Sequence, residues 1–273
     1  MRLCAFADEA SVELEGQIEA LKRNNIDMLE IRGVDGQNIK DISASKLQRI
    51  ADRLRESDIG VWSIGSPCGK NDPCNNLQGQ IDEFKRICES AQALGADRIR
   101  LFSFYTKNER DAFVGLEAFC KAVPKGIVLC HENEKGIFGD DFESCLKIHK
   151  AFPQIKAVFD PANFVQCDVD TKQAWNALHP YVDYMHVKDA LKNKRVVCAG
   201  YGIGNIEYLI NEYAKLGGSV LTLEPHLMEF HGLSELENGE SVSQIPSYSS
   251  NDEAFDAGAD ALKEILIRGN LWK

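Results

Sequence analysis

Eight short apolar segments, each followed by a longer amphipathic one, constrain the fold of this chain more than any other feature. The apolar segments lie at 2–7, 26–31, 60–65, 98–103, 127–132, 156–160, 182–187 and 219–224. Between them, apolar residues recur at spacings of three and four, as in the stripe from Leu77 to Ala91, which Gly95 ends. Strands that alternate with helices form parallel sheets. The pattern therefore predicts an α/β fold, a single (β/α)8 TIM barrel over residues 1–273.

The expected helices fill the intervals between these strands. We place them near 11–24, 47–54, 77–91, 107–122, 141–151, 170–179, 206–213 and 250–266. The last begins with a capping-box spacing from Ser250 to Glu253. The alternative is an open doubly wound sheet, whose dinucleotide-binding form carries a glycine-rich turn after its first strand. Here Ala7 is followed by DEASVELEG, which has no such turn, so the closed barrel is favoured.

Composition argues against several classes of protein. The chain has 31 Lys and Arg against 42 Asp and Glu, a net charge of −11, which disfavours a nucleic-acid partner. No apolar run reaches the roughly 18 residues of a membrane span, and the opening MRLCAFADEA does not resemble a signal peptide. The nine cysteines are scattered and odd in number, which favours free thiols. We therefore expect a cytoplasmic protein without a membrane or nucleic-acid partner.

Two segments interrupt the regular spacing. Residues 66–76 form a turn-rich loop after the third strand, and residues 225–249 form a long connection before the last helix. Such a connection at the mouth of a barrel serves as a lid, a substrate contact or a contact between copies in a homo-oligomer. A plain solvent-exposed loop is the alternative.

Four chemically active side chains stand at the ends of the last four strands. They are Glu132, Asp160, His186 and Glu224. Their separations are 28, 26 and 38 residues, about one strand–helix unit each. Active sites of TIM barrels lie at the C-terminal ends of the strands, so we expect these side chains to converge on one side of the mouth.

We expect a divalent metal ion at the centre of this group. Three carboxylates buried together repel one another, and a cation supplies the compensating charge. Oxygen ligands with a single imidazole suit a fairly hard metal with positions open to substrate, so we expect Mn²⁺, with Mg²⁺, Co²⁺ or Zn²⁺ as alternatives. Each residue alone has a plainer explanation, such as a turn or a solvated charge at the rim. Four potential ligands on four successive strand ends are not explained in this way.

Six short motifs resemble those of a known family. They are FADE at 6–9, LEI with Glu30, HEN around Glu132, FDPAN at 159–163, MHVKD at 185–189 and LEPH at 223–226. Over essentially its whole length the chain is similar to the xylose isomerase-like TIM barrels known as sugar phosphate isomerases and epimerases. The resemblance implies that the four strand-end residues bind one divalent metal. It also implies that Glu132 and Glu224 serve as acid and base.

The reaction that we expect is proton transfer at a carbon next to the carbonyl of a sugar or sugar phosphate, through an enediolate that the metal stabilises. A proton removed on one side and returned on the other epimerises the carbon; return to the neighbouring carbon interconverts aldose and ketose. A lyase similar to inosose dehydratases would use the same ligands. A sugar-binding barrel without catalysis is a third hypothesis. An endonuclease IV-like enzyme is disfavoured, because that branch needs histidines at early strand ends and none precedes His131.

Three further residues are candidates for contacting the substrate near the metal. Glu30 ends the second strand and would bind sugar hydroxyls, unless it pairs with Arg32. Asn163 lies in the FDPAN motif, where relatives often carry a substrate contact. Lys188 would bind a hydroxyl or a phosphate, unless it pairs with Asp189.

The outer part of the site is less defined by the sequence. His226 is a candidate substrate contact and, with Trp62, a candidate pocket wall, with packing as the alternative for both. The GYGIG run at 200–204 offers backbone amides that could hold a phosphate, or forms an ordinary glycine turn.

Overall fold

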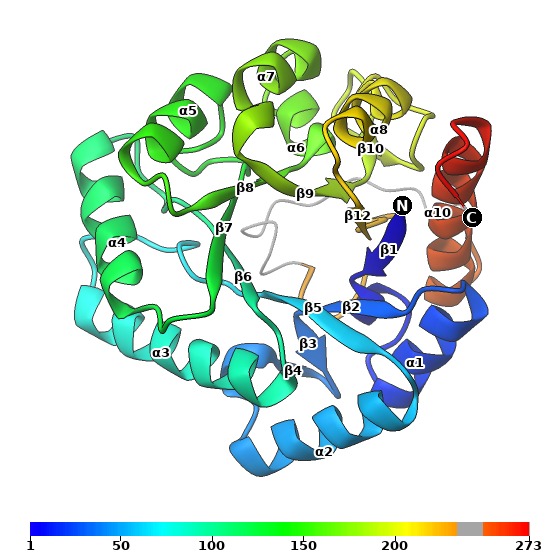
Figure 1. The fold of residues 1–273 in the computed structure, drawn as a ribbon, viewed down its shortest axis with the longest axis horizontal. Coiled ribbons are helices and arrows are strands. Elements are labelled where there is room, and N and C mark those ends of the chain that lie inside the picture. The colour runs from blue at the N-terminus through cyan, green and yellow to red at the C-terminus, as the bar shows by residue number, and fades with distance from the viewer. Residues whose placement is uncertain (234–247, 273) are drawn as a thin grey trace.

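The barrel is closed and all its strands are parallel. The computed structural model describes residues 1–233 and 248–272. Its strands follow the order β1-β12-β9-β8-β7-β6-β5-β2 around the barrel, and β1 pairs with both β12 and β2 (Figure 1). The strands are β1 (Arg2–Ala5), β2 (Met28–Ile31), β5 (Gly60–Gly65), β6 (Arg98–Leu101), β7 (Val128–Glu132), β8 (Lys156–Phe159), β9 (Val182–Val187) and β12 (Val220–Leu223). Each predicted strand is present, and the predicted (β/α)8 barrel is confirmed.

Helices surround the barrel. They are α1 (Leu14–Arg23), α2 (Ala44–Glu56), α3 (Leu77–Leu94), α4 (Glu109–Ala122), α5 (Phe142–Ala151), α6 (Pro161–Gln166), α7 (Thr171–Leu178), α8 (Ile206–Lys215) and α10 (Asn251–Arg268). Ser250 caps α10 as predicted, because its hydroxyl accepts the Glu253 N–H at 3.1 Å. The short helix α6 was not predicted, nor were the hairpins β3–β4 (Gly33–Val34, Gln37–Asn38) and β10–β11 (Asp189–Ala190, Val196–Val197).

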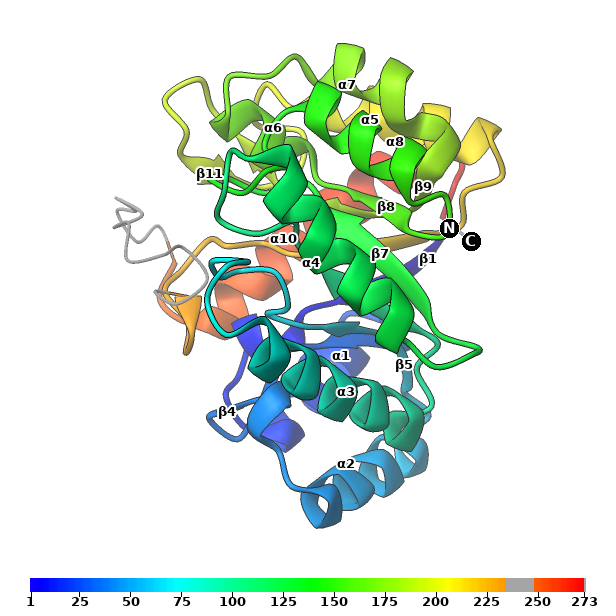
Figure 2. The same ribbon diagram turned by 90° about the vertical axis from the view of Figure 1, so that its left-hand side faces the viewer.

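Both hairpins lie at the end of the barrel opposite the chain termini (Figure 2). This is the end where the barrel strands finish, and it carries the loop at 66–76. Most of the connection predicted at 225–249, namely 234–247, lies outside the described residues, so its role stays a prediction.

Two separate apolar layers follow from the alternation of side chains along each strand. Residues that point outward pack against the helices and form the main core, for example Met185 and Val187 of β9. Residues that point inward form a smaller cluster with Tyr184 of β9. Its other members are Cys4, Met28, Cys130, Val158 and Val220. Continuing each strand by two residues in the same direction therefore brings the next side chain into the barrel above this cluster.

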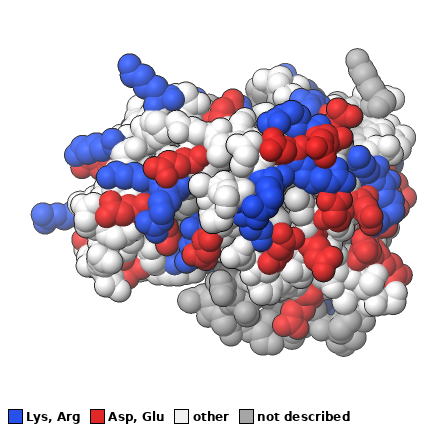
Figure 3. All heavy atoms as spheres, turned by 90° about the horizontal axis from the view of Figure 1, so that it is seen from below, with Lys and Arg blue, Asp and Glu red and all other residues white. Residues whose placement is uncertain are grey.

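The surface and the thiols agree with the composition. On the face shown in Figure 3, lysines and arginines are interspersed with aspartates and glutamates. All nine cysteines are free thiols, as predicted. In the part of the chain that the structure describes, no helix combines the length and the apolar character needed to cross a bilayer.

The buried His149 of α5 makes the stability of the fold depend on pH. Its Nδ1 lies 3.2 Å from the Ile155 carbonyl oxygen, to which it donates, and its ring stacks on Tyr181. Burial lowers the pKa of His149 to about 4. The unfolded chain binds this proton near pH 6.5, so the contribution of His149 to stability is lost as the pH falls from 6.5 toward 4. We expect a loss of about 3 kcal/mol over this range.

Urea unfolding at pH 7.5 and pH 4.5 measures this effect when the protein is compared with H149Q. The glutamine can donate to Ile155 but does not titrate, so the variant should lose less stability on acidification. Equal losses in the two proteins would contradict the assignment.

Candidate metal centre

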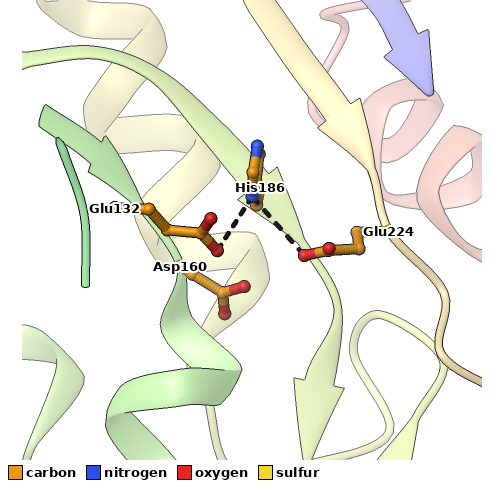
Figure 4. Close-up of side chains that lie close together, drawn as sticks. All are labelled: Glu132, Asp160, His186 and Glu224. Atoms are coloured by element: carbon orange, nitrogen blue, oxygen red, sulfur yellow. Dashed lines mark hydrogen bonds and ion pairs between the residues drawn. The ribbon is translucent and has the colours of Figure 1, made fainter. Parts of the chain in front are cut away.

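The four predicted ligands meet inside the mouth of the barrel. Glu132 ends β7, Asp160 follows β8, His186 lies in β9 and Glu224 follows β12, and these four strands are neighbours in the barrel. All four side chains are buried. Figure 4 shows Glu132 and Glu224 approaching His186 from opposite sides, with Asp160 next to Glu132.

The distances within this group suit a single ion. The Nδ1 atom of His186 lies 3.0 Å from Glu132 Oε1 and 3.4 Å from Glu224 Oε2. One ligand atom from each of the four residues lies within 4.8 Å of all the others. Ligands on opposite sides of a transition metal lie about 4.2 Å apart. Small side-chain rotations would therefore bring all four residues onto one cation.

Glu30 lies on the far side of the His186 ring. Its Oε2 is 3.1 Å from His186 Nε2, while Tyr184 and Thr222 donate hydroxyl hydrogen bonds to its two oxygens at 2.9 and 3.0 Å. A carboxylate in this position holds the proton on Nε2 and directs the Nδ1 lone pair toward the metal. Glu30 is fully buried and does not pair with Arg32, and its position argues against the expected contact with substrate hydroxyls.

Three buried cations surround the carboxylates. Lys188 Nζ lies 2.8 Å from both Asp160 Oδ2 and Glu224 Oε2, although only the latter contact has hydrogen-bond geometry. Arg100 Nε lies 3.1 Å from Glu132 Oε2, and Arg32 Nη1 lies 3.1 Å from Glu224 Oε1.

Sequence reasoning missed Arg100 and assigned other partners to Arg32 and Lys188. The available signal was the alternation in RIRLFS, which places Arg98 and Arg100 on the same face of a strand. Arginine inside a barrel requires a carboxylate partner.

The pKa values of Asp160 and His186 indicate that the buried group lacks positive charge. Burial raises the pKa of Asp160 to about 6, with Glu132 and Glu224 adding to the rise and Lys188 opposing it. Burial opposes a charge on His186, yet Glu132 and Glu30 outweigh it and raise the pKa of His186 well above its usual value. Protons are thus held where a divalent cation would supply the charge. The donor set and its electrostatics both fit a divalent metal.

The remaining candidates lie around Glu132, Asp160, His186 and Glu224, which we call the metal group. The side-chain amide of Asn163 donates to Glu132 Oε1 at 3.3 Å and to the Asn133 carbonyl at 2.9 Å. The His226 Nε2 atom lies 3.3 Å from Glu9 Oε1 and 3.4 Å from Glu224 Oε1.

Trp62 and the GYGIG run do not face the metal. Trp62 packs on Tyr184 and Arg98 at the opposite end of the barrel interior, so it is not a wall of the mouth. The GYGIG run is an ordinary turn whose amides at Gly200, Gly202 and Gly204 donate to Asp189.

A cavity of about 650 Å³ opens beside the metal group. Arg32 lines it and also contacts Glu224, so the cavity adjoins the site. The hairpin β3–β4, Lys40, Lys70 and His231 form other parts of its wall. Sequence reasoning did not bring this wall together, because its residues come from four separate loops, those after β1, β2, β5 and β12.

Comparison with known proteins defines the family. Residues 18–265 match the family model described as xylose isomerase-like TIM barrel. The chain belongs to this family. The expected resemblance is confirmed, and no curated protein matches the sequence significantly.

Several solved structures share the fold of this chain. They include the IolI protein with a bound zinc atom (TM-score 0.76, 16% identity, covering 98% of this chain and 99% of that one). D-psicose 3-epimerase with D-tagatose from Clostridium cellulolyticum H10 has a TM-score of 0.75 at 15% identity, with 100% of both chains covered. The probable 3-DHS dehydratase AsbF from Bacillus anthracis has a TM-score of 0.72 at 13% identity, covering 96% of this chain and 99% of that one. At these identities the likeness establishes the fold.

The role of Glu30 can be tested through metal affinity. We expect E30Q to bind Mn²⁺ about 10- to 100-fold more weakly than the parent protein, because the amide no longer fixes the ring orientation and the basicity of His186. Calorimetric titration at pH 7.5 measures this. Y184F, which leaves the His186–Glu30 contact in place, is the control and should lose less affinity. An unchanged affinity in E30Q would show that Glu30 does not support His186.

The raised pKa values predict how metal affinity depends on pH. Binding requires neutral His186 and ionised Asp160, so protons compete with the metal. The logarithm of the association constant should rise with pH, and more steeply below pH 6, where Asp160 is also protonated, than above it. Titrations with Mn²⁺ between pH 5 and pH 8 measure the slope. An affinity independent of pH would contradict metal binding by these two residues.

Proposed function

We propose that this protein is a divalent-metal-dependent isomerase that epimerises or isomerises a sugar by moving a proton at the carbon next to a carbonyl. The observation that supports this most directly is the pair of buried glutamates, Glu132 and Glu224, on opposite sides of His186 within one ligand group. Sugar epimerases among the structural neighbours agree with it.

The residues Glu132, Asp160, His186 and Glu224 would hold the metal. When bound, a divalent cation such as Mn²⁺ would supply Lewis-acid stabilisation of the negative charge that develops on the substrate oxygen. Zinc in the IolI neighbour leaves the choice among Mn²⁺, Mg²⁺, Co²⁺ and Zn²⁺ open.

The two glutamates would carry the proton. Burial alone would raise the pKa of Glu224, but Lys188 and His226 outweigh it and keep the pKa well below the usual value. Glu224 is therefore ionised at neutral pH and can accept a proton. Glu132, anchored by Arg100 and Asn163, would take up a proton from solvent and deliver it from the opposite side, which inverts the carbon, while Glu224 releases the abstracted proton to solvent.

The side chains at the edge of the metal group would bind the substrate. Lys188 lies between Asp160 and Glu224 and would donate to a substrate oxygen. His226 beside Glu224 and the amide of Asn163 beside Glu132 would contact hydroxyls on either side. The adjoining cavity would hold the rest of the sugar.

A lyase is the second candidate, because an acid stands next to the base. The ammonium group of Lys188 lies 2.8 Å from Glu224 Oε2, so it could protonate a β-hydroxyl leaving group after Glu224 removes the α-proton. The dehydratase among the structural neighbours has the same fold. A lyase releases water and gives a conjugated product that absorbs in the ultraviolet, whereas an epimerase keeps the mass of its substrate.

Proton NMR in deuterated water tests both candidates. We expect the Mn²⁺-loaded protein, given ketoses, their phosphates and inosose, to exchange the α-hydrogen of at least one compound. E132Q and E224Q should each slow this exchange by at least 100-fold, because each lacks one proton carrier. E89Q, which changes an exposed residue of α3, is the matched control and should keep full activity. Turnover of a sugar without deuterium incorporation would exclude the proton-transfer mechanism.

A further inference from the structure

We infer that the substrate of this site is an uncharged polyhydroxy carbonyl compound without a phosphate group. This inference rests on the proposed function and names its substrate class. It follows from two places near the mouth where backbone amides or cations gather, because in both the protein supplies its own carboxylates.

The first place is the turn at 200–204. The amides of Gly200, Gly202 and Gly204 converge, as amides do around a bound phosphate. The carboxylate of Asp189 occupies their centre and accepts from them at 3.1, 2.9 and 2.8 Å, and it also accepts from Ala190 at 2.8 Å. A side chain added at Gly202 would meet Asp189 at 2.3 Å, which shows how closely the turn surrounds it. No donor of this turn is left for an external anion.

The second place is the 650 Å³ cavity, whose wall includes three cations. Arg32 is held by both oxygens of Asp8 at 2.9 Å and by Glu9 and Glu224. Lys70 lies 2.8 Å from Glu134. The ion pair of Lys40 is the longest of the three, with its Nζ atom 3.8 Å from Glu83 Oε2.

Negative charge predominates around these cations. Asp8 and Asp41 also line the cavity. A phosphate dianion would have to displace a carboxylate and leave it without its partner. Hydroxyl groups can instead donate to carboxylates and accept from lysines without separating any pair.

Matched pairs of compounds test the inference on the Mn²⁺-loaded protein. D-Fructose and D-ribulose are compared with D-fructose 6-phosphate and D-ribulose 5-phosphate for α-hydrogen exchange. D-Glucitol and D-glucitol 6-phosphate, which cannot react, are compared for binding by calorimetry. We expect kcat/KM at least tenfold higher for the free ketose, and glucitol binding at least as tight as that of its phosphate.

Removing the carboxylates of Glu83 and Glu134 should strengthen the binding of a phosphate ester. E83Q/E134Q removes these carboxylate partners of Lys40 and Lys70 and should bind glucitol 6-phosphate about tenfold more tightly than the parent. E56Q/E89Q removes the same charge from exposed positions late in α2 and α3 and should not. Thermal unfolding verifies that each variant folds. If E83Q/E134Q does not fold, the single variant E83Q is measured in its place.

The outcomes separate the inference from the proposed function. Faster exchange of a phosphate ester, or tenfold tighter binding of glucitol 6-phosphate by the parent, overturns the inference. No gain of ester binding in the folded E83Q/E134Q also contradicts it. If no compound exchanges its α-hydrogen, the proposed function fails for this panel, while the glucitol pair and the variants still decide whether a phosphate is refused.

Discussion

Burial of negative charge is the constraint on which this site depends. Around His186, six buried carboxylates and three permanent cations form one connected group among the described residues. The carboxylates are Asp8, Glu9, Glu30, Glu132, Asp160 and Glu224, and the cations are Arg32, Arg100 and Lys188. An unpaired buried carboxylate costs several kcal/mol. The group therefore demands added positive charge, and a divalent ion can supply it at the one point where four ligand atoms meet.

Much of the fold and the ligand group could be predicted from sequence because both follow from local periodicity. Eight apolar runs of strand length and the stripes between them determine the barrel, and barrel geometry brings successive strand ends together. Glu132, Asp160 and His186, on three successive strands, could be assigned to one group for this reason alone. The inward direction of each ligand also follows from the alternation along its strand, as in Tyr184 and His186 of β9.

What could not be predicted depends on contacts between distant segments. Arg100 reads as an ordinary strand residue until β6 lies beside β7, where it meets Glu132. Glu30 stands at a strand end like the ligands, yet the ring of His186 separates it from the metal group. The GYGIG turn resembles a phosphate site in sequence, and only the fold shows that Asp189 fills it. In each case the identity of the residue was plain, but its partner was not.

The layers inside the barrel separate stability from chemistry. The lower layer, around Cys4, Cys130 and Tyr184, is packed and mostly apolar. Glu30 lies above it and links the two levels, because Tyr184 donates to one of its oxygens while His186 contacts the other. The His186 ring, which we propose as a metal ligand, is thus fixed by side chains that belong to the packed interior rather than to the surface. A site built in this way can keep its charged groups in place without the metal, provided that protons or lysine supply part of the missing charge. The raised pKa values of Asp160 and His186 and the position of Lys188 agree with this condition.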